Sequence, residues 1–584
     1  ISAVKIMTES TITKIDSNSS FGYLKMFYLS VFLLTLAASA HAMTSEHVNL
    51  DSAGVASTAH PLATQAAEDV YRLGGNSVDA AIAASLVLSV VEPTMSGLGG
   101  RAIALVRSKS GNFYGYNGMT EIPQSFVKAD NMPAFGYSTV ATPGLVAMLG
   151  KIHQQHGKLP FSQLVKPAIK HAKVGFVVLP GEAARQKSAI NEINQNRGMT
   201  ESFLQDEGST LKAGQTLKQP VLAKTLTAIA QEGSDTFYTG KIARLMSEDM
   251  ARNGGYVTLQ DLEDYQVLPG RYISIPYRDH VVHTLAAPGG GGLVAKTLIL
   301  LGLYDLSSLE DRRWAPLVSQ ALGLSIESMA GNYYEKDLVG LVDKTWAIQQ
   351  SKRIYVPAPS KEVEIAQQTI EKSNLTDWVG VVGAHTSHLV AADCSGLTIS
   401  MTQTNGPIFG AKVATSKLGF AYAATMGGYL RTGPQNVGER PRTAIAPVIV
   451  TKDDNVVLAL GAAGGIKIPS AIVQVISRYI DQEKTLSDAL SAPRVHPSAT
   501  IDGNNKRVVR LRAFDAEMSG PGWANGDLNY WRSAGFEISE VDSAASFGRV
   551  HVIAGDQGSL LGEADPDWEG TASAKQVCSM ASYN

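Results

Sequence analysis

The chain has 584 residues, enough for several domains or for one large enzyme domain built from two halves. Its 50 Lys and Arg residues nearly balance 53 Asp and Glu, which argues against a nucleic-acid-binding protein and against an acidic disordered chain. Only two cysteines occur, Cys394 and Cys578, so a disulfide-rich scaffold and a four-cysteine zinc module are both excluded. At most one disulfide can form, and the sequence leaves the pairing of these cysteines open.

The first apolar segment has the pattern of an export signal. Residues 27–38, FYLSVFLLTLAA, are too few to span a bilayer comfortably, and the small-x-small pattern Ala40-His41-Ala42 follows them. We expect residues 1–42 to be a signal and upstream segment, and the mature protein to be periplasmic or secreted. An uncleaved N-terminal membrane anchor is the alternative.

Two helices and a hairpin are predicted near the start of the mature chain. Residues 61–73 carry a helical apolar pattern that a glycine pair ends. The next stretch, 78–91, has polar capping residues before it and is apolar on most faces, which predicts a helix buried between layers. After a glycine loop at 96–100, the apolar runs within 102–116 predict a hairpin.

The sequence pattern changes after Gly383, between the middle of the chain and its C-terminal part. About 145–380 is predicted to be mostly helical, with a second glycine loop at 288–292. After Gly383, short alternating runs predict antiparallel strands: HLVAAD, LTISMTQT, AIAPVIV and VVLALGAA. Helices that flank two sets of strands predict a layered α/β sandwich rather than a doubly wound parallel sheet.

Thr386 stands at the entry of the first of these late strands. A threonine hydroxyl is a poor nucleophile unless a base lies beside it, and one known solution makes the threonine a new N-terminus whose own α-amine is the base. That chemistry requires a cut before Thr386. Thr404, eighteen residues later, is a candidate to orient the first hydroxyl, and the backbone amides of Gly464 and Gly465 are candidates to hold an oxyanion.

More ordinary interpretations compete with each of these signals. A Ser/Thr cluster before a strand is most often a turn, and a glycine cluster is most often a loop. His385 and His388 suggest a metal site with Asp393 or Cys394, but histidines three residues apart on a strand point to opposite faces. Neither GLGGR at 97–101 nor GAAGGIK at 461–467 is a phosphate loop, because no Gly-Lys-Ser/Thr follows.

Taken together, the segments resemble the γ-glutamyltransferase (γ-glutamyltranspeptidase) family of N-terminal nucleophile hydrolases. The resemblance covers almost all of the mature chain, and its motifs occur in the family's order: GGNSVDAAIAASLVLSVVEP at 74–93, SGLGG at 96–100, ATPG at 141–144, APGGGG at 287–292, TSHL at 386–389, APRVH at 492–496 and EADP at 563–566. It implies a four-layer αββα sandwich and autocatalytic cleavage before Thr386. The products would be a large subunit of residues 43–385 and a small catalytic subunit of residues 386–584, paired as a heterodimer.

The resemblance also implies the chemistry. Thr386 would attack a γ-glutamyl amide of the glutathione type, and water or an amino compound would then take the acyl group. Thr404 looks like the supporting hydroxyl, and Gly464 and Gly465 look like the oxyanion hole. No metal, organic cofactor, nucleic acid or membrane partner is implied for the mature enzyme.

The substrate-binding segments depart from the family's pattern. Met119 replaces the arginine that clamps the substrate's α-carboxylate, and Gly427 and Gly428 replace the acidic pair that receives the α-amine. Thr443 and Ala444 replace paired serines, which leaves one hydroxyl of two. Since a bidentate Arg–carboxylate contact contributes about 1.5–3 kcal/mol, these losses predict weak γ-glutamyl binding.

Three functions are therefore compatible with the sequence. The first is a working γ-glutamyltransferase or glutathione hydrolase, with Arg101, Arg431 or Arg442 recruited to the clamp. The second is a divergent acylase or amidase with the same nucleophile and a non-γ-glutamyl substrate. The third is a catalytically idle binding homologue, against which the retained threonines and glycines argue, because an idle site has no chemical need for them.

Overall fold

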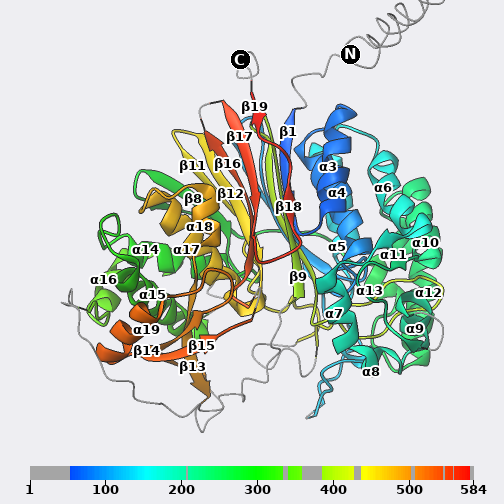
Figure 1. The fold of residues 1–584 in the computed structure, drawn as a ribbon. Coiled ribbons are helices and arrows are strands. Elements are labelled where there is room, and N and C mark those ends of the chain that lie inside the picture. Colours follow the sequence, from blue (N-terminus) through cyan, green and yellow to red (C-terminus); the bar gives the residue numbers. More distant parts are fainter. Residues whose placement is uncertain are drawn as a thin grey trace, which may run out of the picture. The chain divides into compact units, whose positions relative to one another are not determined.

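Figure 1 shows the computed structural model of the chain. It describes residues 53–129, 131–204, 208–332, 340–357, 385–426, 436–501, 507–543, 546–556 and 558–578. The predicted signal segment, Gly427, Gly428 and Arg431 lie outside these ranges. Within them, no helix has both the length and the apolar character needed to cross a membrane.

Two seven-stranded sheets form the centre of the described structure, and their paired strands are all antiparallel (Figure 1). The first sheet has the order β18 (Thr571–Ala572), β1 (Gly54–Thr58), β9 (His385–Asp393), β10 (Thr398–Gly406), β2 (Arg101–Arg107), β3 (Phe113–Gly118) and β6 (Leu268–Pro269). The second has the order β19 (Gln576–Val577), β17 (Ser559–Ala564), β16 (Arg549–Asp556), β12 (Asn455–Ala463), β11 (Val448–Lys452), β8 (His280–Leu285) and β7 (Tyr272–Tyr277).

Each sheet is covered on its outer face by helices, which lie to either side of the sheets in Figure 1. The first sheet packs against α3 (Pro61–Arg72), α4 (Ser77–Val91) and α5 (Leu145–His156), while α6 (Phe161–Val174) packs on α4 and α10 (Pro220–Glu232) packs on α6. The second packs against α14 (Gly291–Leu301) and α17 (Ile468–Ile480), while α15 (Asp311–Asn332) packs on α14. This arrangement confirms the predicted four-layer αββα sandwich.

Smaller elements complete the two outer layers. The other described α-helices are α7 (Pro180–Ser188), α8 (Ile190–Ile193), α9 (Arg197–Phe203), α11 (Thr236–Thr239), α12 (Lys241–Arg252), α13 (Leu259–Glu263), α16 (Lys344–Ser351), α18 (Leu486–Ser491) and α19 (Asn525–Ser533). The remaining strands are β4 (Phe176–Val177) with β5 (Thr216–Leu217), and the sheet of β13 (Val495–Ile501), β14 (Arg507–Glu517) and β15 (Glu537–Val541).

The predicted buried helix is α4, and all fifteen of its residues are buried. The Asn76 side chain accepts from the backbone N–H of Asp79, and the Asp79 carboxylate accepts in return from the backbone of Asn76. This reciprocal cap satisfies N–H groups that would otherwise lack partners at a buried helix start. The small alanine side chains let α4 lie between α3, α6 and the first sheet.

The described part of the middle segment is mostly helical, as predicted, and 272–285 in addition forms the hairpin β7–β8 at the edge of the second sheet. One local prediction was wrong. The run AIAPVIV forms a strand only from Val448, because Pro447 has no N–H to donate to a strand partner. The Pro447 carbonyl is still bound, since the Thr284 hydroxyl donates to it at 2.8 Å.

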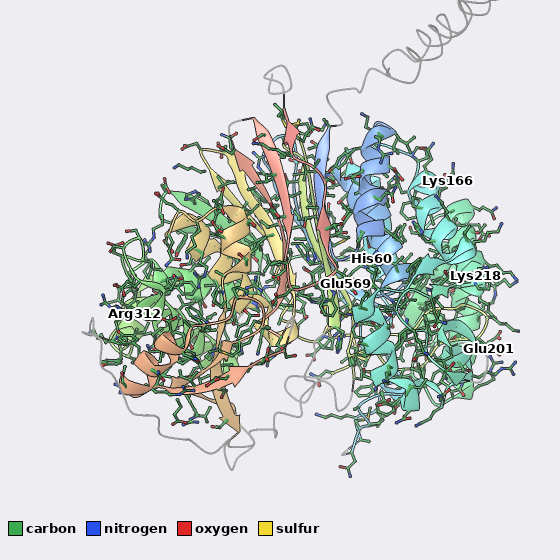
Figure 2. All side chains as sticks on the ribbon, in the orientation of Figure 1. His60, Lys166, Glu201, Lys218, Arg312 and Glu569 are labelled. Atoms are coloured by element: carbon green, nitrogen blue, oxygen red, sulfur yellow. A yellow bond between two sulfur atoms is a disulfide. The ribbon has the colours of Figure 1, made fainter. Side chains whose placement is uncertain are left out.

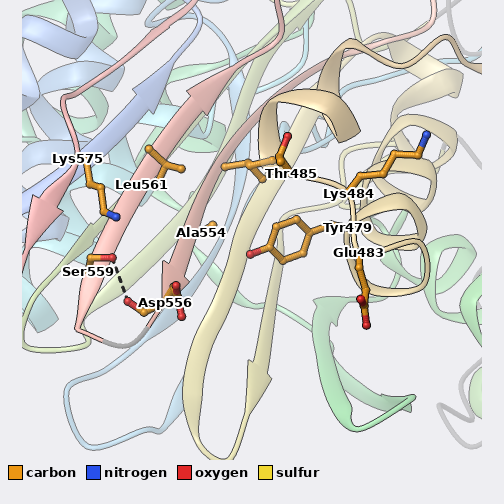
Figure 3. A pocket seen from close by; sticks show the side chains of 10 residues that line it. Tyr479, Glu483, Lys484, Thr485, Ala554, Asp556, Ser559, Leu561 and Lys575 are labelled. Atoms are coloured by element: carbon orange, nitrogen blue, oxygen red, sulfur yellow. Dashed lines mark hydrogen bonds between the residues drawn. The ribbon is translucent and has the colours of Figure 1, made fainter. Parts of the chain in front are cut away.

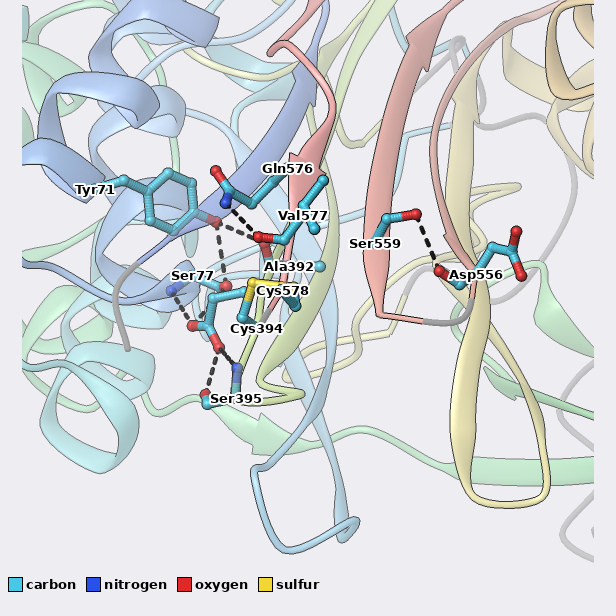
Figure 4. The surroundings of a disulfide bond; sticks show 11 residues. Tyr71, Ser77, Ala392, Cys394, Ser395, Asp556, Ser559, Gln576, Val577 and Cys578 are labelled. Carbon is cyan, nitrogen blue, oxygen red and sulfur yellow. Dashed lines mark hydrogen bonds between the residues drawn. A yellow bond between two sulfur atoms is a disulfide. The ribbon is translucent and has the colours of Figure 1, made fainter. Parts of the chain in front are cut away.

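Cys394 and Cys578 form a disulfide with a Cα–Cα distance of 5.3 Å (Figure 4). Cys394 follows β9 of the first sheet, and Cys578 follows β19 of the second, so the bond joins the two sheets. Beside it, the Tyr71 hydroxyl donates to the Ala392 carbonyl at 3.2 Å. Thr386 and Cys394 are at opposite ends of β9, about 26 Å apart at the usual rise per residue.

We expect the double variant Cys394→Ala/Cys578→Ala to lose about 2–4 kcal/mol of unfolding free energy, because its unfolded chain is no longer closed into a long loop. Denaturant titration measures the loss. Reductant should lower the midpoint of the parent protein and leave that of the double variant unchanged. Equal midpoints for parent and variant without reductant would contradict the prediction.

Candidate functional site

Thr386 and Thr404 lie together at one end of the neighbouring strands β9 and β10. The Thr386 hydroxyl donates to Thr404 Oγ1 at 3.3 Å, and the Thr404 hydroxyl donates to the carbonyl oxygen of His385 at 2.5 Å. The backbone N–H of Gly406 donates to Thr404 Oγ1 at 2.8 Å. The Thr404 hydroxyl is thus bound to the carbonyl of the peptide bond that precedes Thr386.

A shift in strand register creates this contact. The β9–β10 pairing is regular up to Ser387 and Gln403, and then shifts so that His385 lies opposite Gly406. Such an irregularity redirects a side chain and interrupts the backbone ladder at one point. Here the His385 carbonyl accepts from the Thr404 side chain at the point of the shift.

The side chains of β9 alternate between two environments, as expected for a strand. Val390 and Ala392 belong to the apolar cluster between the sheets, and Leu389 and Ala391 belong to the cluster under the helices. By the same alternation, Thr386 faces the space between the sheets. Its side chain is buried, with 4% exposure.

On the opposite face of β9, Ser387 joins a buried polar network with the end of α4. The Ser387 hydroxyl donates to Glu92 Oε2 at 2.6 Å and lies 3.1 Å from Ser96 Oγ. The Gln403 amide donates to Ser96 Oγ at 2.9 Å. Burial raises the pKa of Glu92 to about 7, although Arg185 and Arg549 oppose the rise.

Two arginines that sequence analysis did not single out lie close to the candidate nucleophile. Arg549, at the start of β16, donates from Nη2 to the carbonyl oxygen of Thr386 at 3.4 Å. Its guanidinium lies 4.2 Å from the ring centre of Trp568, and that of Arg185 lies 4.7 Å from the same ring. No local motif marks Arg549, which is far from Thr386 in the sequence.

Gly464 and Gly465 follow the last residue of β12, which pairs with Arg549 of β16. Their φ angles of +144° and +56° are ones that L side chains rarely adopt, and a Cβ on Gly464 would lie 2.7 Å from the Gly548 backbone. These steric constraints are sufficient to explain why glycine occupies both positions of the turn. The turn is connected to Thr386 through Arg549, which pairs with Ala463 and donates to the Thr386 carbonyl. The role of the glycine amides as an oxyanion hole stays a prediction.

The predicted substrate-binding residues lie in two places. Met119 is fully buried in the apolar cluster between the sheets, and its carbonyl accepts from the Tyr265 hydroxyl at 2.7 Å. Thr443 and Ala444 pack on the second glycine loop: the Thr443 N–H donates to the Pro288 carbonyl at 2.8 Å, and a Cβ on Gly290 would lie 2.5 Å from the Ala444 carbonyl. Gly428 lies outside the described residues.

One of the arginines considered for the missing clamp is described near the site. Arg101 lies opposite Thr404 in the β10–β2 ladder. Its Nη1 donates to the Ala424 carbonyl at 3.2 Å and to the Thr425 hydroxyl at 3.0 Å. In the described structure, Arg101 therefore holds the segment before the predicted amine-binding position.

The histidines near Thr386 do not form a metal site. His388 faces the second sheet, where its ring centre lies 6.2 Å from that of His551, and Cys394 is in the disulfide. The Asp393 carboxylate accepts from the backbone and hydroxyl of Ser77 at 3.0 and 2.9 Å. Among the described residues, no cluster of three or more His, Cys, Asp or Glu side chains is arranged to hold a metal ion.

A pocket of about 420 Å³ lies at the far end of β16 from Arg549 (Figure 3). Its lining includes Tyr479, Glu483 and Lys484 from the end of α17 and the segment after it, with Asp556 and Lys575. Neither Thr386 nor Thr404 lines this pocket. It is therefore separate from the threonine site.

A four-layer αββα sandwich with a threonine at the start of a central strand defines the class of N-terminal nucleophile hydrolases. Within this class, the family model of γ-glutamyltranspeptidase matches residues 63–575, and the chain belongs to that family. It is accordingly an enzyme, a hydrolase or transferase of the N-terminal nucleophile type.

The chain is similar both to proteins named glutathione hydrolases and to proteins named acylases. The glutathione hydrolase proenzyme of Escherichia coli (strain K12) is 27% identical over 552 residues, which cover 88% of this chain and 90% of that protein. The acylase ACY 1 proenzyme of Pseudomonas sp. (strain SE83) is 28% identical over 475 residues, with coverages of 76% and 82%. The crystal structure of cephalosporin acylase from Bacillus halodurans matches with a TM-score of 0.76 and 25% identity, covering 89% of this chain and 95% of that one.

The raised pKa of Glu92 predicts a pH-dependent stability. The folded state binds the proton more tightly than the unfolded state, so stability should fall by up to about 3 kcal/mol as pH rises from about 4.5 to about 7. Glu92→Gln should remove this part of the slope, as measured by denaturant titrations at pH 5 and pH 8.

Glu201→Gln is the matched control for this experiment. Glu201, labelled on the outer helices in Figure 2, has its pKa lowered by a hydrogen bond from Arg197. Its substitution should leave the slope between pH 5 and pH 8 unchanged. Equal slopes in the parent protein and Glu92→Gln would show that Glu92 is already ionised at pH 5.

Proposed function

We propose that the chain is a self-processing amidohydrolase or acyltransferase whose nucleophile is Thr386, and that it is cut between His385 and Thr386. The observation that carries the proposal is the position of the Thr404 hydroxyl. It accepts from the attacking hydroxyl at 3.3 Å and donates to the carbonyl of the bond to be cut at 2.5 Å.

This geometry supports a proton relay for the cut. Thr386 Oγ1 bonds to the carbonyl carbon of His385, its proton passes to Thr404 Oγ1, and the proton of Thr404 passes to the carbonyl oxygen. Collapse of this intermediate breaks the C–N bond, gives the proton to the Thr386 nitrogen and leaves an ester. Water then hydrolyses the ester and frees a carboxylate on His385 and an α-amine on Thr386.

The mature site would use the same hydroxyl on a substrate. The new α-amine takes the Thr386 proton as Oγ1 attacks an amide carbonyl, and the amides of Gly464 and Gly465 hold the oxyanion. The departing amine takes the proton and leaves a threonine acyl-enzyme. Water or an amino compound then accepts the acyl group, and no cofactor enters the cycle.

The two proposed subunits, 43–385 and 386–584, would remain a heterodimer because both contribute to each sheet. In the first sheet, β9 and β10 of the small subunit lie between β1 and β2 of the large subunit. In the second, β11 of the small subunit pairs with β8 of the large subunit. Separating the subunits would break strand ladders on both sides of the core.

We also propose that the protein is exported, to the periplasm or the medium. The disulfide between Cys394 and Cys578 supports this location, since structural disulfides persist in oxidising compartments. The apolar segment and the cleavage pattern within residues 1–42 support it independently.

The first candidate substrate is a γ-glutamyl amide, as the name of the E. coli relative suggests. The second is an amide whose acyl group carries no amino-acid head. Met119 favours the second candidate, because a buried thioether among apolar side chains cannot bind a carboxylate. The acylase names among the relatives fit the same candidate.

The cut can be tested with three variants. Thr386→Ala should give an intact band on a denaturing gel, because the attacking hydroxyl is absent. Thr404→Val should slow the cut by about 100-fold or more, since it removes the donor to the carbonyl, and Thr404→Ser, the matched control, should be cut. Mass spectrometry should find Thr386 at the new N-terminus, and a cut in Thr386→Ala would assign the step to a protease.

Three chromogenic anilides can separate the candidate substrates. The γ-glutamyl anilide carries an α-amine and an α-carboxylate, the glutaryl anilide lacks the amine, and the butyryl anilide lacks both. We expect kcat/KM for the glutaryl or butyryl compound to equal or exceed that for the γ-glutamyl compound. A preference of about 100-fold for the γ-glutamyl anilide would establish the first candidate instead.

A further inference from the structure

Arg549 is a buried cation whose only hydrogen bond in the described structure is to the nucleophile's own backbone. Nη2 donates to the Thr386 carbonyl, while Nε and Nη1 have no hydrogen-bond partner among the described residues. The side chain is 3% exposed. Burial, and next the charge of Arg185, lower its pKa to about 10, so the guanidinium still carries its proton at neutral pH.

The positive charges around the site act on the side chain of His385 and help to lower its pKa. The pKa of the His385 imidazole is held well below its ordinary value by burial, and then by the charges of Arg185, Arg549 and Lys412. The α-amine produced by the proposed cut would occupy the place of the peptide nitrogen between His385 and Thr386. It would therefore lie in the same field.

Acidic groups around the site offset this field only in part. Glu182 is engaged by Arg185 at 2.9 Å, and Asp565 by Arg494 at 2.6 Å. Glu569, labelled in Figure 2, accepts from the Gly181 N–H at 2.6 Å, and burial raises its pKa. Burial also raises the pKa of Glu92 to about 7, so this carboxyl carries only part of a negative charge at neutral pH.

The buried imidazoles near the site add no positive charge. Burial lowers the pKa of His60 and of His551 to about 3, and that of His388 well below its ordinary value. At neutral pH these three rings are uncharged. Arg185 is paired with Glu182 and Lys412 with Glu192, both at 2.9 Å, whereas no carboxylate among the described residues forms an ion pair with Arg549. Arg549 is therefore the cation whose charge at the cut is least offset.

We propose that Arg549, with Arg185 behind it, keeps the α-amine of mature Thr386 in the neutral form that accepts the hydroxyl's proton. An ordinary α-amine has a pKa of about 7.7–8.0 and is mostly protonated at pH 7. A cation roughly 6 Å away, at an effective dielectric constant of about 20, lowers such a pKa by one to two units. Arg549 is thus a positioning residue, since it acts through the amine and not on the substrate.

This inference rests on the proposed cut before Thr386, and the experiment starts from protein shown by mass spectrometry to begin its small subunit at Thr386. The pH profile of kcat/KM is recorded with the best of the three anilides. In Arg549→Met the acid limb should move about one unit to higher pH, because the protonated amine is no longer opposed. Arg549→Lys keeps the charge and should keep the limb near its parental pH.

A matched control separates the field from packing. Arg478 is also buried over a tryptophan, 4.1 Å from the ring centre of Trp314, but it is paired with Asp311 at 3.1 Å. Arg478→Met should lower the thermal midpoint and leave the acid limb in place. A purely structural role for Arg549 would give the same result in Arg549→Met.

A second readout does not depend on turnover. Cyanate carbamoylates only neutral amines, and mass spectrometry of the N-terminal peptide of the small subunit follows the reaction. Its pH midpoint should rise in Arg549→Met by the same unit as the acid limb. Arg185→Met should shift both midpoints in the same direction by a smaller amount, and it serves as the test if Arg549→Met does not fold.

The outcomes keep the two proposals apart. A small subunit that does not begin at Thr386 overturns the proposed function. A correctly cut enzyme in which neither Arg549→Met nor Arg185→Met moves the acid limb or the carbamoylation midpoint overturns the role of the arginines alone.

Discussion

The hydrogen bonds of one hydroxyl organise the threonine site. Thr404 Oγ1 accepts from Thr386 and from the backbone of Gly406 and donates to the His385 carbonyl. The β9–β10 ladder shifts register between Gln403 and Gly406, and the Thr404 side chain lies at this shift. In the proposed mechanism, the central sheet therefore positions the reacting groups as well as forming the core of the fold. Two further contacts hold the start of β9. Glu92 accepts from the Ser387 hydroxyl, and the Arg549 guanidinium donates to the Thr386 carbonyl.

Much of this site could be predicted from the sequence, because it depends on local geometry. Thr386 and Thr404 are equally far along the chain from the turn that joins β9 to β10, so antiparallel pairing brings them together. The helix at 78–91 was predictable for a similar reason, since its apolar character on most faces requires burial. The wrong prediction also has a local cause, because Pro447 shortens β11. The hairpin at 272–285 was not predicted, because the alternation in 272–277 is too brief to stand out in a helical region.

Other features depend on contacts between distant parts of the chain. Arg549 reaches Thr386 only because β16 pairs with β12 in the second sheet while β9 lies in the first. The Trp568 ring contacts two guanidinium groups, which come from different layers, and no sequence motif around Trp568 predicts these contacts. The pairing of Cys394 with Cys578 needed the positions of both strand ends. Gly427 and Gly428, at the positions predicted to bind the substrate's amine, lie outside the described residues.

The interleaving of strands from both sides of the proposed cut has a consequence for folding. The precursor can form each sheet within one molecule, at the cost of closing loops in a single chain. Once cut, the same sheets would have to re-form from two molecules, and recovery after denaturation would depend on protein concentration and compete with aggregation of exposed strand edges. The mature form would then persist because it unfolds slowly, so its lifetime would be governed by an activation barrier rather than by an equilibrium.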